Sequence, residues 1–180
     1  MEFTVHRGLA ERSQVVDLWS NSLVVAALKH SPVRLENLED LLRGTVRHLI
    51  IGDPGTTPFG RYTKQALINA RVWSGIKRKI RTKRHVTLAM EWLMRSNPDT
   101  VAIVYDTNLT SYTRVVLKIP DHLHDPIRYF GVPLASSQQI QAARTLAEFL
   151  RSPRADAIFS RWGFGIPWIG PDKTAPDSTQ

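Results

Sequence analysis

The segment from His48 to Ala70 most constrains the fold, because it encodes an apolar strand, a turn and a helix in immediate succession. The strand is the run HLIIG, and the next five residues, DPGTT, have turn chemistry. Thr57 is a good N-cap and Pro58 a good first helical residue, so we expect a helix from there to about Ala70. A strand that leads directly into a helix is the repeating unit of α/β folds.

A second unit of the same kind follows. A helix beginning near His85 has apolar residues at helical spacing, and Asn97-Pro98 ends it before a strand at 101–105. Two such units predict a parallel sheet and an α/β fold class. Other expected elements are strands at 21–28, 115–119 and 127–134, a short helix at 35–42 that stops at Gly44, and a polar loop at 120–125.

Two further helices are expected near the C-terminus. Ser136 and Gln139 have the spacing of a capping box, and an apolar stripe follows them. Ser152-Pro153 begins the last helix, in which Ile158 and Trp162 are expected to face one side and which Gly163 ends. The final residues from Pro171, which are mostly polar and include two prolines, predict a disordered tail.

The composition is that of a globular chain of one domain or two small lobes, with 180 residues and 42% hydrophobic content. No run approaches the roughly 18 apolar residues of a membrane span. The absence of cysteine excludes disulfides and thiolate metal sites. The N-terminal segment MEFTVHRGLAERSQ has none of the features of a signal peptide, so we expect no export address in the chain as written.

Basic residues are concentrated in one segment of this chain, whose formal charge is +8. Seven of the 24 basic residues lie between positions 71 and 84 with no acid among them, and a solvated helix face and loop is the simplest explanation of the run. Such a patch can also steer anions or bind nucleic acid. We rank nucleic acid last, because no aromatic interleaving or recognition motif accompanies these residues: Arg71, Lys77, Arg78, Lys79, Arg81, Lys83 and Arg84.

The start of the first predicted helix is a candidate anion site. The backbone N–H groups of Phe59, Gly60 and Arg61 have no acceptor within the helix and lie at the positive end of its dipole. Gly60 would let a ligand approach the backbone closely, and threonine hydroxyls such as that of Thr57 could add donors. Most capped helix starts bind only water, so this signal is weak by itself.

The second helix start, at His85 and Val86, strengthens the prediction. Ligands of open α/β sheets bind beyond the carboxyl ends of the parallel strands, where both helix starts are expected. Tyr105 ends the next strand and would bring a phenolic O–H donor to the same edge. A half-buried core tyrosine is an equally good explanation of that residue.

Other site chemistries have less support. The loop containing Asp121, His122, His124 and Asp125 could hold a transition metal, but a solvated loop explains its composition fully. The chain has no G-x-S-x-G, H-E-x-x-H or phosphate-loop motif. We therefore expect no enzymatic activity.

Three segments, taken together, resemble a known family. They are GDPGTTPFGRYTKQAL, HVTLAMEWLMRSNPDTVAIVYDTNL and DPIRYFGVPLASSQQIQAARTLAEFLRSPRADAIFSRWGFGIP, and they are similar to molybdate-binding proteins of ABC transporters over residues 1–168. The resemblance implies a type II periplasmic binding fold that closes on molybdate or tungstate through neutral donors, with no metal cation and no cofactor. It places those donors at the backbone N–H groups of Phe59 and Val86 and the hydroxyl of Tyr105, with support from Thr57 and Gly60. The family has a small residue where Phe59 stands.

The resemblance also implies a domain organisation. Residues 1–20 are a remnant of the first lobe, residues 21–126 the second lobe, residues 127–168 the returning part of the first lobe, and residues 169–180 a tail. The family's leader and its serine-bearing first-lobe segment have no counterpart here. We therefore expect one complete α/β lobe, one incomplete lobe that exposes apolar surface and favours self-association, and impaired binding.

The leading hypothesis is thus the substrate-binding component of a molybdate importer, which acts in the periplasm with a membrane permease. A cytosolic oxyanion-sensing effector domain is the alternative, because related folds serve there and a chain starting at Met1 without a leader would stay in the cytoplasm. Molybdate, tungstate and sulfate are all tetrahedral dianions, so the sequence admits each of them.

Overall fold

The structure is a computed structural model and describes residues 2–166. These residues form two compact units. One is the continuous segment Asn21–Ile127, here called the central unit, and the other, the flanking unit, is formed by the segments on either side of it. No helix in the described part of the chain is both long enough and apolar enough to cross a membrane.

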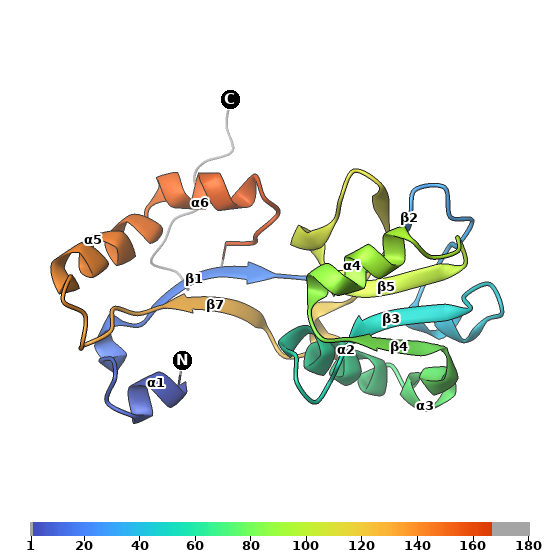
Figure 1. Ribbon diagram of the computed structural model, residues 1–180, viewed down its shortest axis with the longest axis horizontal. Helices are drawn as coiled ribbons and strands as arrows, with labels where there is room; N and C mark the ends of the chain where they lie inside the picture. Colours follow the sequence, from blue (N-terminus) through green and yellow to red (C-terminus); the bar gives the residue numbers. More distant parts are fainter. Residues whose placement is uncertain (1, 167–180) are drawn as a thin grey trace. The chain divides into compact units, whose positions relative to one another are not determined.

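A five-stranded mixed sheet is the framework of the central unit (Figure 1). Strand β3 lies parallel to β4 on one side and to β5 on the other, whereas β2 is antiparallel to both β5 and β6. The parallel pairing predicted from the two strand–helix units is thus confirmed for β3 and β5. Among the five strands β2 alone runs in the opposite direction, which a local apolar pattern does not encode. The strands, in spatial order, are β4 (Ile80–Lys83), β3 (His48–Gly52), β5 (Thr100–Tyr105), β2 (Leu23–Leu28) and β6 (Thr113–Lys118).

Helices cover both faces of this sheet. Helices α2 (Pro58–Asn69) and α3 (Trp73–Ile76) pack on one face and α4 (Val86–Met94) on the other (Figure 1). Alternation along β2 fills both layers: Val25 joins the cluster that contains Leu67 of α2, and Val24 the cluster that contains Leu93 of α4. Short 3₁₀ segments complete the unit: η2 (Leu38–Leu42), η3 (Lys77–Lys79), η4 (Asp106–Asn108) and η5 (Asp121–Leu123).

The basic segment differs from its prediction as a helix face and loop. It contains η3 and then β4, an edge strand in which Arg81 and Thr82 are exposed and Ile80 packs against the core. An edge strand needs few apolar side chains, so its sequence pattern is weak. The helix expected at 35–42 is also shorter, because Asn37 and Asp40 form a reciprocal capping box that begins η2 at Leu38.

The flanking unit is a two-stranded sheet with short helices. Its elements are α1 (Glu2–His6), η1 (Arg12–Gln14), β1 (Val16–Asn21), β7 (Ile127–Gly131), α5 (Ile140–Leu150) and α6 (Pro153–Ser160). Its buried cluster consists of Leu18, Trp19 and Ala155, and the Trp19 ring stacks on Phe159 with centroids 3.5 Å apart.

Two capping predictions in this unit have opposite outcomes. Ser152 caps α6 as expected, and its hydroxyl accepts the N–H of Ala155 at 3.3 Å. The predicted Ser136–Gln139 capping box is wrong: Gln139 is itself the N-cap of α5 and makes no side-chain cap.

Trp162 lies beyond the end of α6 and is exposed, so it does not share a helix face with Ile158. The predicted tail at 169–180 lies outside the described residues.

Candidate functional site

The β3–α2 turn is closed by hydrogen bonds of Thr57, the predicted N-cap. Its hydroxyl accepts the N–H of Gly60 at 3.1 Å and donates to the carbonyl of Asp53 at 2.8 Å. The hydroxyl has one proton, and that proton is used within the turn. Thr57 therefore supports the helix start, whereas its predicted use as an extra donor to a ligand does not fit this geometry.

Two glycines allow α2 to begin directly against the end of β3. A Cβ on Gly60 would lie 2.5 Å from the carbonyl oxygen of Gly52, and one on Gly52 would lie 2.4 Å from the Thr57 hydroxyl oxygen. Protein backbone thus fills the space beside Gly60 where a ligand was expected to approach. Gly60 is required for close packing at the helix start, and Gly52 is a supporting residue that the sequence pattern did not indicate.

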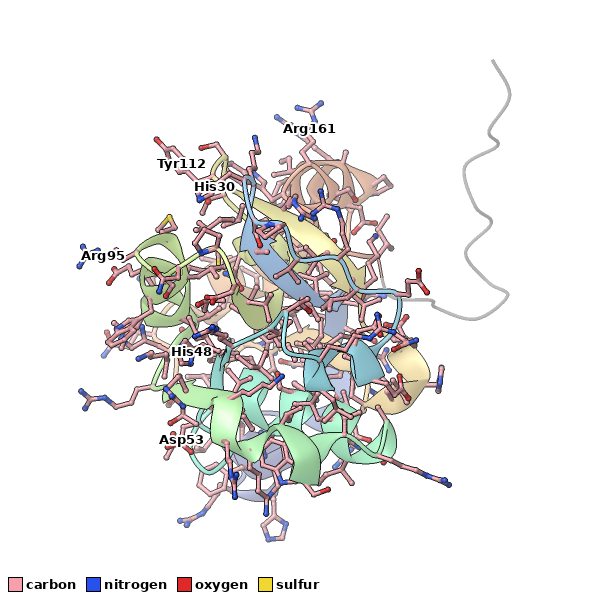
Figure 2. The ribbon with its side chains drawn as sticks, turned by 90° about the vertical axis from the view of Figure 1, so that its right-hand side faces the viewer. His30, His48, Asp53, Arg95, Tyr112 and Arg161 are labelled. Atoms are coloured by element: carbon pink, nitrogen blue, oxygen red, sulfur yellow. The ribbon has the colours of Figure 1, made fainter. Side chains whose placement is uncertain are left out.

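Asp53 connects this turn to the neighbouring strand. Its carboxylate Oδ1 accepts the N–H of Gly55 at 2.8 Å, and its own N–H donates to the carbonyl of Lys83 at 2.9 Å. Asp53 follows β3 and His48 begins it, and both are labelled in Figure 2. Because Lys83 is the last residue of β4, this bond fixes the loops before both helix starts to one another.

The second helix start is capped by histidine. His85 is extended, with φ −154° and ψ 159°, and its ring Nδ1 accepts the N–H of Leu88 at 3.2 Å. The bond requires Nδ1 without a proton. The sequence placed His85 at the helix start but did not predict its capping role, because histidine is not among the usual N-cap residues.

Both helix starts present backbone donors that the protein does not use. Within residues 2–166, the N–H groups of Phe59 and Val86 donate no hydrogen bond to a protein acceptor. These are early positions of α2 and α4, where intrahelical acceptors do not exist and the helix dipole is positive. The carboxyl ends of parallel β3 and β4 carry the two helices at one edge of the sheet.

The structure brings the three predicted donor residues around one apolar cluster. Phe59 as a whole is only 3% exposed and belongs to the cluster beneath α4, against which Val86 and Tyr105 also pack. The Phe59 and Tyr105 ring centroids are 6.2 Å apart. The large side chain of Phe59 is thus directed into the core.

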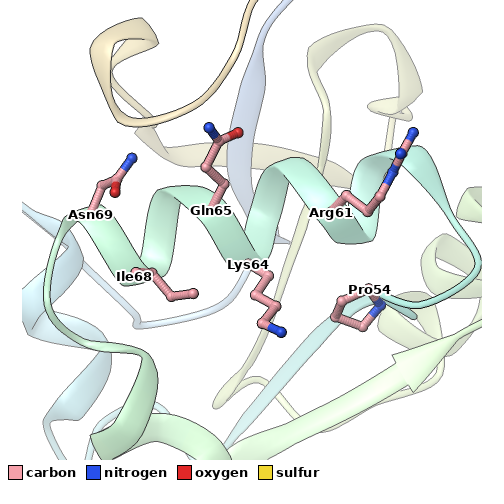
Figure 3. Close-up of a pocket in the computed structure, with 6 residues that line it drawn as sticks. All are labelled: Pro54, Arg61, Lys64, Gln65, Ile68 and Asn69. Carbon is pink, nitrogen blue, oxygen red and sulfur yellow. The ribbon is translucent and has the colours of Figure 1, made fainter.

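A cavity of about 320 Å³ lies along the outer side of α2 (Figure 3). Its lining does not include the three predicted donor residues; it is formed by Pro54, Arg61, Lys64, Gln65, Ile68 and Asn69. Two of these side chains hold the η5 loop, since Gln65 accepts the N–H of Asp125 and Asn69 donates to the carbonyl of Leu123, each at 2.9 Å.

The histidine loop is part of the same packing. His124 is buried beside Tyr62, and its Nδ1 lies 2.8 Å from the carbonyl oxygen of Asp125. His122 instead lies at the rim of another cavity, of about 410 Å³. Across the described residues 2–166, no three potential metal-ligating side chains gather in one place.

A model of the family described as bacterial extracellular solute-binding protein matches residues 1–165. The molybdate-binding protein ModA of Escherichia coli (strain K12) is 29% identical over 174 residues, which cover 92% of this chain and 66% of that protein. ModA of Azotobacter vinelandii is 26% identical over 131 residues, covering 70% and 51% of the two chains. The chain thus spans about half to two thirds of the length of these curated relatives.

Solved structures share the fold. A substrate-binding domain from Clostridium difficile superposes with a TM-score of 0.79 at 27% identity, covering 93% of this chain and 72% of that one. The periplasmic molybdate-binding protein of Azotobacter vinelandii superposes with a TM-score of 0.76 at 19% identity, covering 92% and 74%. The predicted fold class, α/β of the type II periplasmic binding protein kind, is confirmed.

Proposed function

The chain belongs to the bacterial extracellular solute-binding proteins, and we propose that it binds molybdate or tungstate as the substrate-binding component of an ABC importer. The pair of helix starts carries this proposal, since α2 and α4 present the unused N–H groups of Phe59 and Val86 at one edge of the sheet. Backbone N–H groups at a helix start bind oxyanions without a cationic side chain.

The chemistry of these donors suits a fully ionised oxyanion. A backbone N–H can only donate, and a tetrahedral dianion can only accept. The phenol of Tyr105 supplies a third donor beside the same cluster. Binding of this kind requires no metal cation or cofactor, and the family binds solutes without converting them.

The family's extracellular setting favours an importer over a cytosolic sensor. Relatives named for molybdate binding support the choice of anion. We propose that the whole protein acts in the periplasm and delivers the anion to a membrane permease.

Titration calorimetry of the chain with molybdate, tungstate and sulfate tests this function. We expect heat of binding with molybdate or tungstate, and an anion at 100 times its dissociation constant should stabilise the fold by about 2.7 kcal/mol. Tyr105→Phe should weaken binding by roughly tenfold, because a hydrogen bond to a charged group contributes about 1.5 kcal/mol or more. Tyr112→Phe, at a side chain 70% exposed, is the matched control. Absence of heat with all three anions would refute the proposal.

Self-association is proposed for the flanking unit. The side chains of Leu146 and Phe149 on α5 are 56% and 42% exposed, and all of α5 lacks a buried residue. Apolar surface of this kind favours association. Sedimentation velocity should show a concentration-dependent dimer or larger species that Leu146→Glu weakens, and a monomer at every concentration would contradict the proposal.

A further inference from the structure

Two basic residues directly precede the start of α4. Lys83 ends β4, Arg84 follows it, and Val86 begins α4 two residues later. The carbonyl of Lys83 accepts the N–H of Asp53, the residue that begins the turn into α2. The last two residues of the basic segment therefore lie at the edge of the sheet where the unused N–H groups lie.

These two charges have no carboxylate partner among residues 2–166. In the described part of the chain, Lys83 and Arg84 take part in no ion pair, whereas Arg43 and Arg47 pair with Asp40 and Asp99. The Lys83 ammonium instead lies 3.1 Å from the centroid of the Trp92 ring, whose side chain is 52% exposed. Burial, together with the charge of Arg81, lowers the pKa of Lys83. The field of an unpaired cation is not cancelled locally.

Accepting the proposed function as a basis, we propose that Lys83 and Arg84 form a capture point that attracts dianions to the helix starts and sets the association rate. The neutral donors then hold the anion. The division follows from the chemistry, since long-range attraction needs net charge whereas close recognition needs directed hydrogen bonds.

The distance between the Lys83 ammonium and the helix-start donors is short enough for electrostatic attraction. Trp92 follows Val86 by six residues, or about 9 Å along the helix at 1.5 Å per residue. Helical side chains lean toward the N-terminus, which brings the ring and the Lys83 ammonium closer to the donors. The separation is comparable with the screening length of about 8 Å at physiological ionic strength.

The other end of the basic segment is the natural comparison. Lys77 and Arg78 are also exposed cations, but they precede Ile80, and strand β4 then adds about 10 Å before Lys83 at 3.3 Å per residue. Screening should make these two charges much less effective at the helix starts. A competing explanation is that charge along an edge strand only prevents aggregation, and that role would not depend on which end is neutralised.

Stopped-flow measurement of molybdate association, followed by tryptophan fluorescence, tests the capture point. Lys83→Met with Arg84→Gln keeps the aliphatic stem over Trp92 while removing both charges, and Lys77→Gln with Arg78→Gln removes the same charge at the far end. At low ionic strength we expect the first pair to slow association about fivefold and the second pair by less than about twofold. The difference should vanish near 1 M salt, where the screening length is about 3 Å.

The outcomes separate this inference from the proposed function. A wild-type chain that gives no heat with any of the three anions refutes the function, and the capture point with it. If the wild-type chain binds the anion but both double variants slow association equally, or neither slows it, the capture point alone is overturned. If the first double variant fails to fold, the salt dependence of the wild-type association rate decides. A rate that does not change with ionic strength contradicts the inference. A rate that falls steeply with salt in both the wild type and Lys83→Arg supports it.

Discussion

The central and flanking units bury their apolar side chains to very different extents. In the central unit all six residues of β2 are buried and helices cover both faces of the sheet. In the flanking unit the buried cluster has three residues, and α5 contributes none. A two-stranded sheet with so little core is marginal by itself. The proposed donors of the central unit therefore stand on a framework that does not require the flanking unit for its packing.

The largest expected effect is at the close contact in the central unit. Gly60→Ala would place a Cβ 2.5 Å from the carbonyl oxygen of Gly52, so α2 must shift, and we expect a loss of about 4 kcal/mol in the free energy of unfolding. Gly44→Ala is the control, because a Cβ there meets nothing within 4 Å. Urea unfolding measures both, and equal midpoints for the two variants would show that α2 does not depend on this contact.

A pair of leucines compares the two units directly. Leu67 of α2 is fully buried and Leu146 of α5 is 56% exposed. Leu67→Ala should lower the free energy of unfolding by about 3 kcal/mol, and Leu146→Ala by less than about 0.5 kcal/mol. Thermal or urea unfolding at low protein concentration provides the measurement. A large loss at Leu146 would mean that the flanking unit has more core than its exposure indicates.

The smallest expected effect is a pH dependence in the central unit. The N–H of Glu36, 2.7 Å from the Asp40 carboxylate, lowers the pKa of Asp40 below its ordinary value of 3.8; burial opposes this, and the N–H of Asn37 and the charge of Arg43 add to it. Ionised Asp40 therefore stabilises the fold above pH 3.8, and this contribution is lost as the pH falls through the lowered pKa. In Asp40→Asn the free energy of unfolding should therefore fall less steeply with decreasing pH, as measured by urea unfolding from pH 6 to pH 3. Glu39→Gln is the exposed control, and an unchanged slope in Asp40→Asn would contradict the assignment.

The sequence predicted the β3–α2 junction well, because its determinants are local. Thr57 and Pro58 have strong positional preferences at a helix start, and both lie where expected. Strand β4 was missed because Ile80 is its main apolar contact with the core. The direction of β2 was beyond a local pattern, since its antiparallel pairing with β5 depends on partners distant in sequence.

The location of the candidate site at one edge of the sheet was easier to predict than the contacts that support it. Placing Phe59, Val86 and Tyr105 near one sheet edge required only the order of strands and helices. The close packing of Gly52 against Gly60 and the bond from Asp53 to Lys83 depend on tertiary contacts that spacing does not reveal. The division into lobes and the binding role of each donor stay predictions.

Replacement of one backbone donor tests the central claim most directly. Val86 is the first residue of α4 and follows an extended His85, so proline fits there and removes the N–H group without breaking the helix. Val86→Ala also trims the side chain but keeps the N–H. Calorimetry should show molybdate binding to Val86→Pro weaker than to Val86→Ala by about tenfold to a hundredfold, the value of a hydrogen bond to a charged group. Equal affinities in the two variants would contradict anion binding at the helix start.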